Sequence, residues 1–295
     1  MCSSDLAVRR LAQRLAAAGG RRLDDASLHV DVRLPGGTRL HAVLSPIARP
    51  GTLISLRVPA RRTLALEDLV ALGAVDPAGA ELLEALVLAR LALVVSGGTG
   101  SGKTTVLATL LGRVPPTERI VVVEDAAELD PQHPHVVALE ARGANVEGAG
   151  ALDLRILVRQ ALRMRPDRLV VGEVRGAEVV DLLAALNTGH EGGCGTLHAN
   201  SAADVPARIE ALALAAGLDR SAAHSQLASG IGAVVHLART RSGLRHVAEI
   251  ALPERRPDGL VAMVPAFVRS ETPGVAPRLV PGPAATRLLA RLEAA

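Results

Sequence analysis

The stretch that most constrains the fold is residues 91–105, LALVVSGGTGSGKTT. Its apolar first half ends at Val95 and predicts a buried strand, and Gly97–Thr104 match G-x-x-x-x-G-K-T, the phosphate-binding P-loop. Glycines at 97, 98, 100 and 102 let the backbone turn so that successive N–H groups point at phosphate oxygens. The helix expected after them turns the positive end of its dipole to the same anion. The stretch therefore predicts a nucleoside triphosphate site.

Composition supports this interpretation of the loop. Lys103 is the only lysine among the 33 lysines and arginines of the chain. A chain that otherwise uses arginine keeps a lysine where a compact ammonium is needed, here for the β- and γ-phosphates. The Thr104 hydroxyl stands where a Mg²⁺ ligand is expected. The predicted nucleotide-binding residues are Gly97, Gly98, Thr99, Gly100, Ser101, Gly102, Lys103, Thr104 and Thr105.

The rest of the composition limits the class of protein. Apolar residues make up 49% of the chain, with one Phe and no Tyr or Trp, so the core must consist of Leu, Val and Ala. The cysteines Cys2 and Cys194 make neither a disulfide framework nor a zinc site. Glu84 and Arg90 interrupt the most apolar window, which is too short to span a bilayer. We expect a cytoplasmic protein whose membrane contact, if any, is peripheral.

Apolar periodicity divides the chain into parts. Residues 1–58 read as a small α+β domain, apparently truncated, with a helix at 6–18 followed by strands at 28–34, 39–44 and 52–58. A hinge is expected at 59–63. Residues 64–252 alternate apolar strands with helices, which predicts a predominantly parallel sheet covered on both faces, the α/β fold of RecA-like P-loop NTPases. The Pro- and Gly-rich residues 253–295 are expected to form a hairpin and tail.

Polar residues follow the predicted strands at the edge where ligands bind in parallel sheets. Glu124 and Asp125 follow one apolar run, Glu173 another, and His198 a third. A carboxylate such as Glu173 suits the magnesium–water shell or the orientation of an attacking water. Glu124 and Asp125 fit the site or an ordinary turn, and a lone histidine is more often structural than catalytic.

Three segments carry a resemblance to a known family. Glu124-Asp125 with Glu128-Leu129, MRPDRLVVGEVRGAE (164–178) and LNTGHEGGCGTLHANS (186–201) resemble the Asp box, Walker B and His box of the secretion and traffic ATPases. These are the hexameric ATPases of type II secretion, type IV secretion and pilus assembly. The run VGEVRG and residues 23–48 are most similar to the Tad branch, which powers Flp-type pili, and the tetracysteine zinc module of the type II branch is missing from the sequence.

The resemblance implies a role for each matching residue. ATP and Mg²⁺ are the implied cofactors, with Lys103 on the phosphates and Thr104 on the metal. Glu173 corresponds to the Walker B glutamate, which reaches the metal directly or through water. Glu124 corresponds to the Asp-box acid near the γ-phosphate, and His198 to the histidine that couples nucleotide state to the neighbouring strand.

Arginines are also implied, because this family reaches the phosphates with arginines from the first domain or a neighbouring subunit. Arg57 is the best match, and Arg175 is a candidate bridge from the Walker B segment. Arg61 and Arg62 are weaker candidates, for which a solvated linker is as good an explanation.

The resemblance implies a homohexameric motor that hydrolyses MgATP and works on a polytopic inner-membrane platform protein, for pilus assembly or protein export. One alternative is a nucleotide-gated scaffold of the same machinery that does not hydrolyse ATP. Another is a RecA-type nucleic-acid motor, which we disfavour because single-strand channels stack bases on aromatic side chains. No nucleic-acid partner is therefore expected. A small-molecule kinase would need a substrate lid, for which the sequence has no signature.

Overall fold

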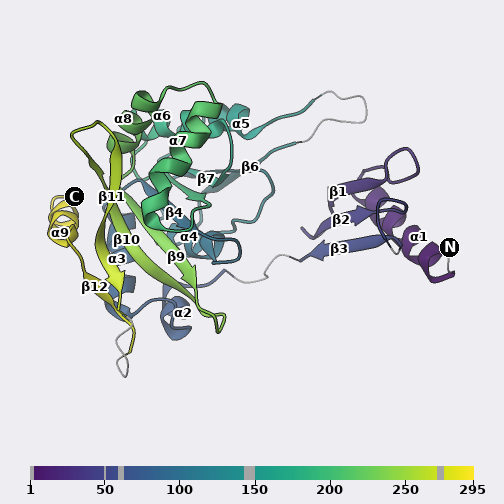
Figure 1. Cartoon of the computed structure of the whole chain (residues 1–295), viewed down its shortest axis with the longest axis horizontal. Helices are drawn as coiled ribbons and strands as arrows, with labels where there is room; N and C mark the ends of the chain where they lie inside the picture. The colour runs from purple at the N-terminus through teal and green to yellow at the C-terminus, as the bar shows by residue number, and fades with distance from the viewer. Residues whose placement is uncertain (1–2, 50, 59–62, 143–149, 271–275) are drawn as a thin grey trace. The chain divides into compact units, whose positions relative to one another are not determined.

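The structure is a computed structural model that describes residues 3–49, 51–58, 63–142, 150–270 and 276–295 (Figure 1). Its internal contacts divide the chain into two compact units, Met1–Arg62 and Thr63–Ala295. The expected hinge at 59–63 lies almost wholly outside the described residues, as do the candidates Arg61 and Arg62.

The first unit pairs one helix with a small antiparallel sheet. It contains α1 (Ser3–Ala18), β1 (His29–Arg33), β2 (Arg39–Val43) and β3 (Leu53–Arg57), in the sheet order β1-β2-β3. Alternate residues of β1 and β2 are buried, because successive side chains of a strand point to opposite faces. Val32 and Leu40 thereby pack with Ala12 and Ala16 of α1 in a core of their own. The observed α+β organisation agrees with the periodicity of residues 6–58.

The second unit is built on a sheet of nine strands in the order β12-β11-β10-β9-β4-β8-β7-β5-β6 (Figure 1). Pairing is parallel from β9 through β4, β8, β7 and β5 to β6, and antiparallel from β9 outward to β12. The strands are β4 (Leu93–Gly97), β5 (Ile120–Glu124), β6 (Val136–Glu140), β7 (Arg168–Val174), β8 (Cys194–Leu197), β9 (Ala233–Arg239), β10 (Arg245–Arg255), β11 (Val261–Arg269) and β12 (Leu279–Pro281). The predicted α/β fold with a mostly parallel sheet is confirmed.

Helices cover both faces of this sheet. The core that includes Leu93 and Val95 holds side chains of α2 (Leu66–Ala71), α3 (Pro77–Leu88), α4 (Lys103–Leu111) and α9 (Ala285–Glu293). The core that includes Val94 holds those of α5 (Leu154–Leu162), α6 (Glu178–Asn187), the short 3₁₀ helix η1 (Ala202–Asp204), α7 (Val205–Ala215) and α8 (Arg220–Gly230). Because neighbouring residues of β4 supply opposite cores, the strand is apolar throughout, as its sequence predicts.

Two parts of the sheet differ from the sequence analysis. Residues 253–295 are not a hairpin followed by a separate tail: β10 and β11 do form a hairpin, but β11 and β12 extend the sheet and Leu288 of α9 is fully buried in its core. Pro253, Pro265 and Pro281 lie within β10, β11 and β12 themselves, so proline does not prevent these strands from joining the sheet. The strand β6, to which the sequence analysis assigns nothing, is a partly exposed edge strand, although four of its five residues are apolar.

Local signals explain where several helices begin. The side chain of Asp153 accepts a hydrogen bond from the Ile156 backbone N–H at 2.8 Å and caps α5. Asp219 caps α8 in the same way. Proline stands in the first turn of α3 and α7, where its missing N–H costs nothing. None of the helices in the described ranges is long and apolar enough to cross a membrane.

Candidate nucleotide-binding site

The P-loop connects β4 to α4 at the carboxyl edge of the sheet. Gly97 has a φ of 150°, and a Cβ there would come within 2.5 Å of the Leu237 carbonyl oxygen on β9. Gly102, the residue before α4, has a φ of 97° in the left-handed region. Both positions require glycine, the first because of close packing and the second because of backbone conformation. The loop is therefore held close against β9 while the backbone at 98–100 stays exposed.

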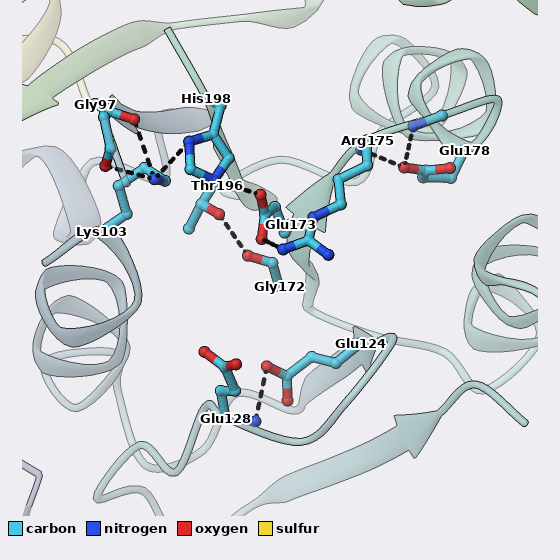
Figure 2. A network of polar contacts seen from close by, with 12 residues as sticks. Gly97, Lys103, Glu124, Glu128, Gly172, Glu173, Arg175, Glu178, Thr196 and His198 are labelled. Atoms are coloured by element: carbon cyan, nitrogen blue, oxygen red, sulfur yellow. Dashed lines mark hydrogen bonds and ion pairs between the residues drawn. The ribbon is translucent and has the colours of Figure 1, made fainter. Parts of the chain in front are cut away.

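The side chain of Lys103 is held inside this loop. Lys103 is only 7% exposed, and its ammonium donates to the carbonyl oxygens of Gly97 at 3.0 Å and Gly98 at 3.1 Å. A longer contact of 3.4 Å joins Nζ to Nδ1 of His198 (Figure 2). Burial lowers the pKa of Lys103, and the nearby charge of Glu173 opposes part of that shift. The ammonium thus lies inside the P-loop, held by neutral acceptors that a stronger anionic acceptor can replace.

The contacts continue from His198 to the acid at the end of β7. Nε2 of His198 lies 2.8 Å from Oε1 of Glu173, and the other carboxylate oxygen is bonded to the guanidinium of Arg175 (Figure 2). Burial lowers the pKa of His198, helped by the positive charge of Lys103. Oε1 of Glu173 makes no hydrogen bond within the described part of the chain, so its contact with Nε2 is a close approach of polar groups, as in an ion pair, and not a hydrogen bond.

The pKa of Glu173 is set by opposing influences. Partial burial alone would raise it, but the hydrogen bond and charge of Arg175, with the charges of His198 and Lys103, hold it below its ordinary value. Glu173 is therefore an ionised carboxylate beside the P-loop. This is the state that a water-orienting or metal-binding acid needs.

A bulge in β7 places Glu173 there. Val171 pairs with Gly195 and Val174 with Leu197, so two residues of β7, Gly172 and Glu173, lie opposite the single Thr196 of β8. An extra residue of this kind redirects the side chains around it. The Thr196 hydroxyl donates to the Gly172 carbonyl oxygen at 2.6 Å and satisfies one of the groups left by the irregular pairing.

Arg175 is fixed from behind by a residue that the sequence analysis did not select. Oε1 of Glu178 accepts the backbone N–H groups of Arg175 at 2.6 Å and Gly176 at 2.8 Å (Figure 2). Glu178 is the first residue of α6, and an acid in the first turn of a helix is the sequence signal that points to such a role.

Glu124 lies apart from this chain of contacts. Its carboxylate accepts backbone N–H groups of Glu128 at 3.1 Å and Leu129 at 3.0 Å, and the residue is 5% exposed. Burial raises the pKa of Glu124 to about 7, against the effect of those two hydrogen bonds. A Cβ on Gly172 would come within 2.5 Å of the Glu124 side chain, so the glycine makes room for it.

The remaining predicted residues fall into three groups. Ser101 is buried, Thr104 is half-buried, and Thr99 and Thr105 are exposed on the loop and first turn. Arg57 is exposed at the end of β3 in the first unit, so its role toward the nucleotide stays a prediction.

Within the described ranges there is no group of three or more His, Cys, Asp or Glu side chains that could hold a metal ion. The hydroxyl of Thr104 and carboxylate of Glu173 nevertheless suit Mg²⁺, which binds through few protein oxygens and keeps several waters.

The sequence of residues 2–259 matches the family described as Type II/IV secretion system protein. A putative conjugal transfer protein of Mycobacterium tuberculosis (strain ATCC 25618 / H37Rv) is 62% identical over 268 residues, which cover 89% of this chain and 76% of that protein. The probable conjugal transfer protein TrbB of Sinorhizobium fredii (strain NBRC 101917 / NGR234) is 34% identical over 76% of this chain and 66% of its own length.

A solved structure shares the fold. The crystal structure of the VirB11 ATPase from the Brucella suis type IV secretion system, in complex with sulphate, has a TM-score of 0.51 and 26% sequence identity. The match covers 81% of this chain and 78% of that one.

Proposed function

Since this chain belongs to the Type II/IV secretion system protein family, we propose that it binds and hydrolyses MgATP as a mechanical motor. The observation that carries the proposal is the unbroken series of contacts from Lys103 through His198 and Glu173 to Arg175, at the edge of the sheet where the P-loop opens. This series brings the predicted phosphate-binding cation, the predicted acid and two further cationic or polar groups to one place. In-line phosphoryl transfer needs such positioning and charge neutralisation more than covalent chemistry.

Each residue has a defined part in the proposed reaction. Lys103 exchanges its carbonyl partners for phosphate oxygens, and Thr104 with Glu173 would hold Mg²⁺, directly or through water. A bound Mg²⁺ would supply positive charge that stabilises the phosphate oxygens. The ionised Glu173 orients the attacking water, and Arg175 holds its carboxylate in place. His198 couples the position of that carboxylate to the neighbouring strand β8. Glu124 is proposed as the second acid, close to the γ-phosphate.

We also propose a homohexamer in which Arg57 reaches the nucleotide, from its own or a neighbouring subunit, and which works on a polytopic inner-membrane platform protein. Residues 23–48 and the run VGEVRG support the Tad branch as the closest functional class, and assembly of Flp-type pili or protein export as the work performed. Membrane contact is then peripheral, at the cytoplasmic face.

The decisive experiment is Mg²⁺-dependent ATP hydrolysis measured over a range of protein concentrations. The rate per subunit should rise as oligomers form and should be lost in Lys103→Ala and Glu173→Gln. Glu254→Gln is the matched control, since this acid is exposed and pairs with Arg287 at the far end of β10. Single-stranded DNA should leave the rate unchanged, as no nucleic-acid partner is proposed.

The same assay separates the alternatives. Tight ATP binding without turnover at any concentration would overturn the motor and favour a nucleotide-gated scaffold. A rate that rises many-fold with single-stranded DNA would favour a nucleic-acid motor.

A further inference from the structure

A buried serine–histidine pair lies beside the P-loop, outside the residues assigned so far. Ser96, the residue before Gly97, is fully buried, and its hydroxyl lies 2.9 Å from Nδ1 of His236. The two residues are also paired across the parallel strands β4 and β9. His236 is 6% exposed, so this polar contact is made in the core and leaving either group without a partner would be costly.

The same imidazole reaches the segment that carries His198. The backbone of Asn200, two residues after His198, is near enough to this ring to raise its pKa as a hydrogen-bond acceptor would. That segment continues into η1, which packs against β9. One ring therefore links the carboxyl end of β4 to the segment that follows β8.

The chemistry of the ring suits this bridge. Burial lowers the pKa of His236, which keeps the ring neutral, and the Asn200 backbone opposes that shift, as expected when the ring is the donor. A neutral ring can then accept a hydrogen bond from the Ser96 hydroxyl at Nδ1 and donate one from Nε2 to the Asn200 carbonyl oxygen. Both nitrogen positions are satisfied only when the two segments keep their present separation.

The two segments that His236 joins are those that share Lys103. The ammonium contacts the carbonyl oxygen of Gly97, next to Ser96, and Nδ1 of His198, two residues before Asn200. We propose that His236 is a positioning residue, which sets the distance between these two acceptors and so transmits occupancy of the P-loop to the segment at 198–204. This inference rests on the proposed nucleotide site.

Substitutions that keep or remove the hydrogen-bonding capacity of the ring test the idea. His236→Leu leaves the Ser96 hydroxyl and the Asn200 carbonyl unpaired, and we expect kcat/KM for MgATP to fall roughly 10- to 100-fold. His236→Gln can accept from Ser96 and donate to Asn200, and should stay within about threefold of the parent protein. Ser96→Ala removes one of the two bonds and should give an intermediate loss; it also covers the case in which the leucine variant fails to fold.

His224 provides the matched control. It is 3% exposed and bonded on both sides, to Glu210 at 2.8 Å and to the Val261 N–H at 2.9 Å, but it joins α7, α8 and β11. His224→Leu should lower thermal stability as His236→Leu does, while kcat/KM of the folded protein stays unchanged. Equal losses of kcat/KM in both leucine variants, or no loss in His236→Leu, would overturn the proposal.

A direct measurement of affinity separates this inference from the proposed function. The dissociation constant of a fluorescent ATP analogue should rise in His236→Leu and Ser96→Ala but not in His224→Leu, even in a protein without turnover. If the unmodified protein binds the analogue and does not hydrolyse ATP, the motor fails and the positioning role is still tested. If the affinities of His236→Leu and His224→Leu agree, the positioning role fails whatever the turnover.

Discussion

Glu124 and Glu173 end neighbouring strands of one sheet, yet their surroundings are opposite. Glu173 is partly exposed and contacts His198 and the guanidinium of Arg175, which hold its pKa below the ordinary value. Glu124 is buried, is bonded to two backbone N–H groups and has a pKa raised to about 7. The sequence presents both as acids after an apolar strand, and the folded structure makes one a stable anion and the other a titrating group near neutrality.

The difference shows how position and environment divide the work in this site. Both carboxyl groups owe their place to the carboxyl edge of a parallel sheet. The charge state of each depends on which other segments reach it. Glu173 contacts cationic side chains because the bulge in β7 turns it toward β8. Glu124 instead packs against Gly172 and is bonded to the backbone that follows its own strand. Proximity to the P-loop alone therefore does not make two acids equivalent.

The largest expected effect is the loss of hydrolysis in Glu173→Gln. Removal of the anion that orients water should lower kcat by roughly 100-fold or more, while ATP binding persists. The loss of kcat in Glu124→Gln should be at least tenfold smaller than the loss in Glu173→Gln, because a buried acid near its pKa is only partly ionised at neutral pH. Steady-state hydrolysis with parallel binding measurements checks this, and equal losses in the two variants would erase the distinction between the acids.

The pH dependence of stability is the next largest effect. A carboxyl whose pKa is higher when folded binds more protons in the folded state, so stability falls as pH rises from the unfolded pKa near 4.5 toward about 7. The change is a few kcal/mol at most, since one pKa unit is worth about 1.4 kcal/mol. Glu124→Gln should flatten this decline.

Denaturant unfolding of both proteins at about pH 5 and about pH 8 tests that prediction. Glu249, whose pKa burial also raises, contributes in the same direction to both proteins, so their difference isolates Glu124. A decline of the same size in the glutamine variant would show that Glu124 is not its source.

The contact between Gly172 and Glu124 gives a third test. The Cβ of Gly172→Ala would lie 2.5 Å from Cγ of Glu124, and such overpacking should destabilise the protein by about 1–3 kcal/mol. Gly98→Ala is the control, because nothing lies within 4 Å of the Cβ position there. In a Glu124→Ala background the cost of Gly172→Ala should shrink, and additivity in this double-mutant cycle would contradict the contact.

The smallest effect is expected at Glu178, which supports Arg175 from behind. Glu178→Ala leaves two backbone N–H groups without their acceptor and should cost about 1 kcal/mol of stability, as loss of a helix cap does. Hydrolysis should fall only a few-fold, because Arg175 keeps its bond to Glu173. Glu293→Ala, an exposed acid of α9, is the control and should change neither thermal stability nor rate. A loss of rate as large as that of Glu173→Gln would make Glu178 more than a support.

Much of the molecule could be predicted because its signals are local. Apolar runs fixed the strands that enclose the P-loop, and glycine spacing fixed the loop itself. Glu124, Glu173 and His198 were identified by their places directly after such runs. The edge strand β6 was missed although four of its five residues are apolar. Residues 253–295 were separated from the sheet because proline and glycine content hides the alternating burial of β11.

The roles of partners far apart in sequence could not be predicted in the same way. Lys103 and His198 are separated by 95 residues, and Ser96 and His236 by 140. A side chain 140 residues away leaves no periodic trace near Ser96, and a buried histidine in an apolar strand looks like any other interruption of that strand.

The sequence by itself determined that this chain has a P-loop between a buried strand and a helix, within a mostly parallel sheet, since spacing along the chain dictates local conformation. Only the tertiary structure decided that Glu173 is an anion while Glu124 titrates near neutrality, and that His236 joins the two segments around Lys103. Burial and charge depend on the neighbours that folding brings together, and the order of strands in the sheet selects those neighbours.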